Sequence, residues 1–176
     1  PRRYREESAA WEMYYAILRY WHGESSDDQL SDRAEELIGQ AYRDAVRSVD
    51  GFIDTLSEVI SPYDPITVFH SDHGEALGEH GNLGHEQTLY EENLHVPMFV
   101  HNARTEERVS EQFPLRSLPE LLIELIQSAE FNPRSQTQPF VISKTENNQK
   151  ISVRTDSWKY IYTEGGELLY SLNDSD

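Results

Sequence analysis

The chain has 176 residues, which is enough for one domain with a hydrophobic core or for a piece of a larger domain. Its 32 acidic residues outnumber its 15 basic ones, and the resulting net charge of −17 argues against a nucleic-acid backbone or an anionic membrane as a partner. The sequence contains no cysteine, which excludes disulfides and thiolate metal sites.

The first third of the sequence predicts two helices. Residues 2–21 have helical character, and after a polar break residues 30–60 repeat apolar side chains every three or four positions. Ser61-Pro62 ends the second helix, because proline cannot continue a helix interior. Residues 1–7 resemble the middle of a helix, so we predict that the chain is part of a longer polypeptide. No membrane-spanning run or signal peptide is found. The predicted location is the cytoplasm, and secretion stays open as the alternative because the chain is predicted to be part of a longer polypeptide.

The remaining sequence predicts mainly strands. Residues 66–69 and 96–100 are short apolar runs typical of buried strands, and residues 117–126 have a helical pattern. Four further runs suit an antiparallel meander: 140–143, 151–154, 158–162 and 167–170. We predict an α/β fold in which a parallel sheet with covering helices forms residues 1–135 and a small antiparallel β subdomain forms residues 136–176.

A polar loop after the first predicted strand is the most informative segment. Residues 69–75 read Phe-His-Ser-Asp-His-Gly-Glu, and residues 77–81 read Leu-Gly-Glu-His-Gly. In an open α/β sheet, sites lie beyond the carboxyl ends of the strands. Asp72 and His73 together suit a divalent cation: Mn, Zn, or Ca if other carboxylates complete the site. The alternative is that Asp72 caps the following turn and His73 is an ordinary polar residue.

Other side chains near this loop have weaker claims to a chemical role. Glu75 and Glu79 could also be metal ligands, but solvated glutamates are the simpler interpretation in so acidic a chain. His80 is better explained as a structural histidine that holds the loop. His85 could donate to an anionic substrate oxygen or protonate a leaving group, although a surface histidine is the simpler interpretation. No hydroxyl near the loop has the neighbours that a nucleophile requires.

Arg154 and Lys159 flank a predicted hairpin near the end of the chain. Their positive charges could face an anionic substrate. Cationic side chains are usually solvated, however, so the simpler interpretation is an exposed pair on the surface of the β subdomain.

Four segments, in order, resemble the C-terminal half of the sulfatases, within the alkaline-phosphatase-like superfamily. They are the helix residues 41–50, the loop 67–81, residues 89–100, and the closing strands 152–161 with 167–170. The resemblance implies a partial alkaline-phosphatase-like sheet with covering helices. It also implies hydrolysis of a small-molecule sulfate ester and a divalent metal, with Ca first and Mn or Zn as alternatives.

The resemblance also implies roles for individual residues. Asp72 and His73 would complete a divalent metal site whose other ligands lie upstream. His85 stands where the family usually carries a lysine that contacts the substrate's sulfate. His73 departs from the animal-type sulfatases, which have asparagine there, and agrees with phosphonate and phosphate ester hydrolases. An ester hydrolase or phosphotransferase of that kind is therefore the alternative.

The family's nucleophile is missing from this sequence. It is a modified cysteine (formylglycine) or a serine in a Cys/Ser-x-Pro/Ala-x-Arg motif, and the 176 residues contain neither cysteine nor this motif. We therefore expect the chain to carry half of an active site and to be inactive alone. A non-catalytic binding or structural domain is a further alternative.

Overall fold

The computed structural model describes residues 7–22, 31–85, 88–103, 106–127, 132–146 and 148–173. The chain forms two compact units. The helical unit comprises residues 1–64 and 75–86, and the sheet unit comprises residues 65–74 and 87–176. Among the helices in the described residues, none has both the length and the apolar character needed to cross a bilayer. The subdomain boundary predicted between residues 135 and 136 stays a prediction.

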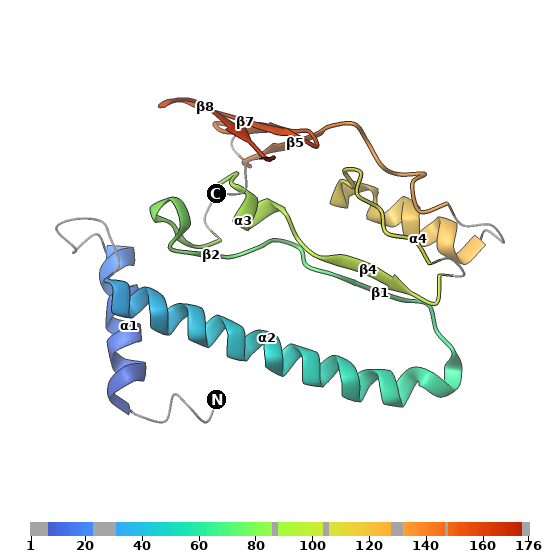
Figure 1. The fold of residues 1–176 in the computed structure, drawn as a ribbon, viewed down its shortest axis with the longest axis horizontal. Helices are drawn as coiled ribbons and strands as arrows, with labels where there is room; N and C mark the ends of the chain where they lie inside the picture. The colour runs from blue at the N-terminus through green and yellow to red at the C-terminus, as the bar shows by residue number, and fades with distance from the viewer. Residues whose placement is uncertain are drawn as a thin grey trace. The chain divides into compact units, whose positions relative to one another are not determined.

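The helical unit consists of two helices and a short hairpin. Its elements are α1 (Glu7–His22), α2 (Asp32–Ile60), the 3-10 turn η2 (Ser61–Tyr63), β2 (Ala76–Leu77), the 3-10 turn η3 (Glu79–Gly81) and β3 (Leu83–Gly84). The helix α1 crosses α2 near the start of α2 (Figure 1). The Ser31 hydroxyl accepts the Ala34 N–H at 3.3 Å and so caps α2. Both predicted helices are confirmed, except that residues 2–6 and residue 30 lie outside the described ranges.

In the sheet unit, β1 (Thr67–His70) pairs with β4 (Met98–His101) in antiparallel orientation, with Val68 opposite Val100. The prediction of a parallel sheet is therefore wrong for this pair. Parallel neighbours need a crossover connection, usually a helix with its loops. In the described part of residues 71–97, no helix is longer than the four residues of α3 (Glu91–Leu94). The chain accordingly returns beside β1 in the opposite direction.

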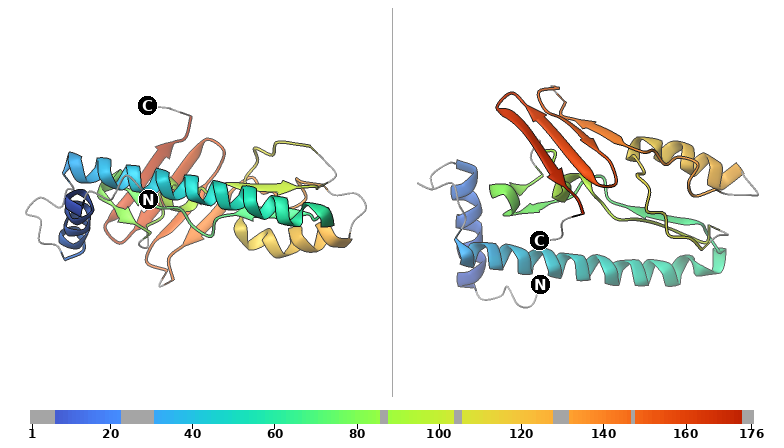
Figure 2. Two further views of the ribbon diagram at one scale, coloured as in Figure 1. Left: turned by 90° about the horizontal axis from the view of Figure 1, so that it is seen from below. Right: turned by 45° about the horizontal axis from the view of Figure 1, so that its top comes forward.

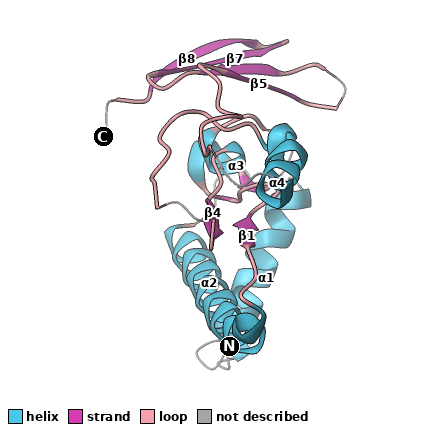
Figure 3. Ribbon diagram, turned by 90° about the vertical axis from the view of Figure 1, so that its right-hand side faces the viewer, coloured by secondary structure: helices cyan, strands magenta, loops and turns pink. Residues whose placement is uncertain are grey.

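The helix α4 (Leu118–Gln127), which follows the 3-10 turn η4 (Leu115–Ser117), packs on this strand pair. Figure 3 shows α4 beside β1 and β4. Leu121 and Leu125 are buried together with Ala103. Partly buried apolar side chains surround them: Val68, Met98, Val100, Phe113 and Leu118. This apolar core fixes the strand whose end leads into the Asp72-His73 loop.

A four-stranded antiparallel sheet follows in the sheet unit. Its strands pair in chain order, as β5 (Val141–Lys144), β6 (Ile151–Arg154), β7 (Trp158–Thr163) and β8 (Gly166–Ser171). The strands lie side by side in Figure 2, in orange and red. The predicted meander is confirmed. Its buried face includes the polar Ser152 and Lys159 beside Ile161.

Candidate metal site and substrate pocket

Asp72 and His73 lie directly after β1, in the sheet unit. The Asp72 Oδ2 atom is 3.8 Å from the His73 Nε2 atom, and 83% and 47% of the two side chains are exposed. Two atoms at this separation can each lie about 2.2 Å from one ion, a distance typical of carboxylate and imidazole ligands. The structure therefore brings the two predicted ligands together in a geometry that one divalent cation can use.

The orientation of the His73 ring also suits a metal ligand. Its Nδ1 atom is 2.9 Å from the Gly74 carbonyl oxygen. Because a carbonyl oxygen only accepts hydrogen bonds, this contact assigns the proton to Nδ1 and leaves the Nε2 lone pair on the side of Asp72. Histidines that bind metals commonly donate their second ring N–H to a carbonyl in this way.

The Asp72 carboxylate is held in its charged form. Hydrogen bonds from backbone N–H groups, its own first and then that of His73, lower the pKa of Asp72 below its usual value, and the nearby His73 ring adds to this. The His73 N–H lies 3.0 Å from Oδ1. This bond matches the turn-capping alternative for Asp72. The two roles are compatible, because Oδ1 accepts the backbone bond while Oδ2 faces the imidazole.

Gly74 fixes the loop against α3. Its N–H donates to the Asn93 carbonyl at 2.9 Å, and Asn93 is buried. A Cβ atom at position 74 would lie 1.9 Å from the Glu92 carbonyl oxygen and 2.9 Å from its carbon. Only glycine allows the backbone to approach this closely. The position of the two candidate ligands therefore depends on contact with α3.

Glu91 of α3 is in turn bound by two cations of the C-terminal sheet. Its carboxylate accepts from Lys159 Nζ at 2.7 Å and from Arg154 Nε at 2.9 Å, and Arg154 also donates to Gln112. Only 1% of the Lys159 side chain is exposed. The interpretation of Arg154 and Lys159 as a solvated surface pair is therefore wrong. Glu91 is more than sixty positions from both cations in the sequence, so no local sequence pattern could predict the contact.

A wide pocket of about 1230 Å³ lies within the sheet unit. Asp72 and His73 line it together with two exposed arginines, Arg108 and Arg116. Guanidinium groups bind sulfate-like and phosphate-like oxygens well, because their donors form a planar fork. The lining also includes the carboxylates of Glu107, Glu111 and Asp156, so the pocket carries charged side chains of both signs.

His85, the third predicted site residue, belongs to the helical unit and follows β3. Its Nδ1 atom is 3.2 Å from the Glu75 Oε2 atom. Two other residues of the loop, Glu79 and His80, shape the turn between the strands. Glu79 accepts the Leu77 N–H at 2.6 Å, and His80 adopts a left-handed backbone with φ of 54°. This agrees with the interpretation of His80 as structural. The Glu75 partner of His85 was missed because the two strands are only two residues each.

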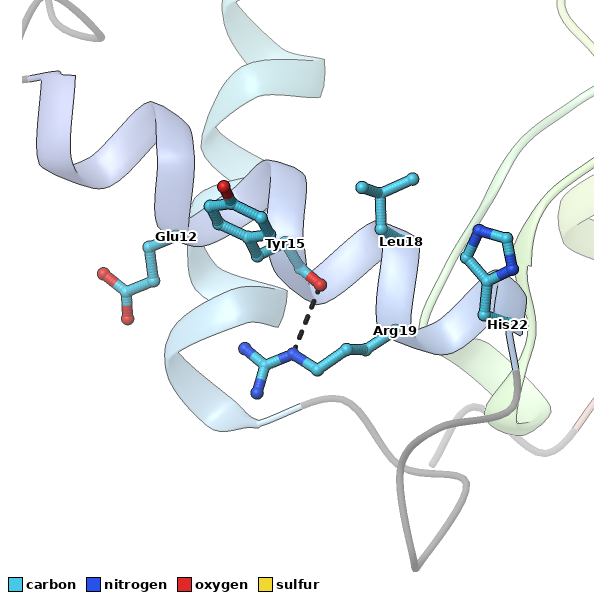
Figure 4. Close-up of a pocket in the computed structure, with 5 residues that line it drawn as sticks. All are labelled: Glu12, Tyr15, Leu18, Arg19 and His22. Carbon is cyan, nitrogen blue, oxygen red and sulfur yellow. Dashed lines mark hydrogen bonds between the residues drawn. The ribbon is translucent and has the colours of Figure 1, made fainter.

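A second hollow runs along α1 and is lined by residues of this one helix (Figure 4). Arg19 Nε donates to the Tyr15 carbonyl at 3.3 Å within it. The other lining residues are Glu12, Leu18 and His22. Spacings of three and four residues place all five on one helix face, which accounts for the hollow without a ligand.

Comparison with known protein families identifies the chain. The model of the sulfatase family matches residues 14–117, more than half of the 176 residues. This chain belongs to the sulfatase family. The matched range contains the Asp72-His73 loop and His85. Neither the curated proteins nor the solved structures gave a significant match.

Membership places the chain among hydrolases of the sulfatase type, which act on small-molecule sulfate esters and generally use a divalent metal. The resemblance found in the sequence is thereby confirmed. The match ends at Ser117, so the C-terminal sheet, with Arg154 and Lys159, lies outside it. Its contacts to Glu91 connect that sheet to the matched region.

Proposed function

We propose that this chain is part of a metal-dependent sulfatase that hydrolyses sulfate esters of small molecules. The family match over residues 14–117 carries the proposal. Asp72 and His73 hold the divalent cation, and their 3.8 Å separation and the Nδ1–H of His73 support this role. The bound cation supplies Lewis-acid stabilisation of charge on the ester oxygens. A carboxylate and an imidazole suit Ca with further carboxylates, or Mn or Zn.

The remaining parts of the active site come from two sources. His85, which replaces the family's lysine, contacts the sulfate of the substrate as a hydrogen-bond donor. The nucleophile and the other metal ligands are supplied by residues other than these 176, since the chain has no cysteine and no Cys/Ser-x-Pro/Ala-x-Arg motif. On this proposal the chain alone does not turn over substrate.

A phosphate or phosphonate ester is the second candidate substrate, and His73 is the residue that favours it. Related phosphonate and phosphate ester hydrolases resemble this chain in having histidine at that position. An assay of the full polypeptide distinguishes the two candidates. A kcat/KM that is higher for an aryl sulfate than for the matching aryl phosphate supports the sulfatase, and the reverse ratio supports the second candidate.

Titration of the isolated chain with Mn²⁺ is expected to show weak binding centred on Asp72 and His73, because only part of the ligand set is present. Paramagnetic broadening of backbone amide NMR signals should be strongest at residues 72–74. Asp72→Asn should remove the broadening, because it removes a charged ligand. Asp54→Asn, the same change at an exposed site on α2, is the control and should leave the broadening intact.

Two results of this titration would contradict the proposal. Tight one-to-one binding would mean that the metal site is complete within the chain. Broadening at residues 72–74 that survives Asp72→Asn would remove Asp72 from the metal site.

A further inference from the structure

The hairpin of the helical unit places Glu75 opposite His85. The strands β2 and β3 pair antiparallel, with Ala76 opposite Gly84 and Leu77 opposite Leu83. One step further in the same register sets Glu75 against His85. Side chains directly opposite in an antiparallel pair have Cβ atoms about 5 Å apart. The observed distance of 3.2 Å between Glu75 Oε2 and His85 Nδ1 is therefore a consequence of the strand register.

The two helices hold this hairpin in place. The Tyr20 hydroxyl donates to the Gly81 carbonyl at 3.0 Å and accepts the Leu83 N–H at 3.2 Å. Ala76 and Leu83 are buried. Gly84, with φ of 91°, lies so close to the Trp21 ring that an added Cβ would be 3.4 Å from it. Because the hairpin is anchored at its turn and along both strands, the positions of Glu75 and His85 are defined by the fold.

The chemistry of this contact specifies which ring nitrogen carries the proton. An ionised carboxylate only accepts hydrogen bonds, so Nδ1 of His85 must be the donor. This leaves Nε2 as the atom through which the ring acts on another group. Carboxylates that orient histidines in this way fix both the tautomer and the ring plane, as in catalytic triads and in metal sites.

We propose that Glu75 is a positioning residue that holds His85 with Nδ1 protonated and so presents Nε2 to the substrate. This inference rests on the proposed role of His85 toward the sulfate group. It assigns the contact with the ester oxygens to Nε2, which donates to an anionic oxygen when the ring is cationic. When Nε2 of the cationic ring passes its proton to an ester oxygen of the substrate, Nδ1 keeps its own proton through Glu75, and the neutral ring that results has its lone pair on Nε2.

The test is the tautomer of His85 in the metal-free chain, measured from ring ¹⁵N chemical shifts at mildly alkaline pH and assigned with His85→Gln. We expect His85 to carry its proton on Nδ1, whereas a histidine side chain in water favours Nε2. Glu75→Ala should shift His85 to the Nε2-protonated form, because the acceptor is lost. Glu75→Gln should retain the Nδ1 proton, because its amide oxygen still accepts. The His80 signals should stay the same in both variants.

Two results would overturn the inference. One is an Nε2-protonated His85 in the unaltered chain, which decides the question even if Glu75→Ala does not fold. The other is an equal change in Glu75→Ala and Glu75→Gln, which would indicate distortion of the hairpin and not loss of the acceptor. The tautomer is measured without metal and is judged by the Glu75 variants, whereas the Mn²⁺ titration is judged by Asp72→Asn, so failure here is distinguishable from failure of the metal-site proposal.

Discussion

Replacing Glu91 by glutamine is expected to lower the free energy of unfolding of the sheet unit by about 3 kcal/mol. The change leaves the Lys159 ammonium, of which 1% is exposed, without its charged partner at 2.7 Å. It also removes the charge that Arg154 contacts at 2.9 Å. A buried charge that loses its partner is far more costly than an exposed one. Urea denaturation followed by circular dichroism measures the change.

Two variants sharpen this test. Glu111→Gln also removes a carboxylate that accepts from an arginine, Arg134 at 2.8 Å, but this pair is exposed and the loss should be much smaller. Lys159→Met should also have a small effect, because it replaces the buried cation by an apolar side chain of similar size and leaves Glu91 paired with Arg154. Equal losses for Glu91→Gln and Glu111→Gln would contradict the importance of the buried contact.

The pH dependence of stability should report the same carboxylate. Burial alone would raise the pKa of Glu91, but hydrogen bonds from Lys159 and Arg154 bring it below the ordinary value of 4.5. The folded state therefore binds fewer protons than the unfolded state in this range. The ionised Glu91 carboxylate therefore stabilises the fold above pH 4.5, and this contribution is lost as the pH falls through the pKa of Glu91 in the folded state. The free energy of unfolding of Glu91→Gln should therefore fall less steeply with acidification than that of the unaltered chain. The same dependence on pH in both proteins would contradict the role of Glu91.

Gly74→Ala is expected to destabilise the sheet unit by about 3 kcal/mol, the upper part of the range for overpacking. The new Cβ would meet the Glu92 carbonyl oxygen at 1.9 Å, and a backbone atom of α3 cannot rotate away as a side-chain tip can. The loop must therefore leave α3 and break the Gly74–Asn93 hydrogen bond. Urea denaturation measures the loss, and Mn²⁺-induced broadening at residues 72–74 should weaken with it.

The matched control is Gly51→Ala in the exposed middle of α2, where an added Cβ meets nothing within 4 Å. We expect this change to stabilise the helical unit by about 0.5–1 kcal/mol, because alanine loses less backbone freedom than glycine in a helix. If Gly74→Ala were as harmless as Gly51→Ala, the close approach of the loop to α3 would be contradicted.

The elements that the sequence predicted well are those with a local signal. Apolar spacing predicted a helix over residues 30–60, and α2 spans Asp32–Ile60 with Ser31 as its cap. The four strands of the meander are also visible in the sequence as short apolar or aromatic runs, and tight turns separate the last three. The direction of the β1–β4 pair could not be read in this way. The relative direction of the two strands depends on the course of the connection formed by residues 71–97, and this connection has no periodic sequence pattern from which its course could be predicted.

The candidate site shows the same division. Asp72 and His73 are adjacent in sequence, so their proximity follows from the chain itself. The contacts that hold their loop in place could not be predicted in this way, because the contact between Glu91 and Lys159 spans 68 positions. The Glu75–His85 contact lies between these extremes. The sequence evidence for this contact is a Gly-rich turn between Ala76-Leu77 and Leu83-Gly84. Strands of two residues are too short to show the alternation of apolar and polar side chains by which a strand is predicted.

The burial of Lys159 makes this residue a natural reporter of unfolding. The chain has three lysines, at positions 144, 150 and 159. Amine-reactive reagents need an accessible side chain, which Lys144 offers and Lys159, with 1% of its side chain exposed, does not. Modification at Lys144 should therefore proceed in the native protein. Modification at Lys159 should wait for the C-terminal sheet to open, so the ratio of the two products, read by mass spectrometry, measures how often it does.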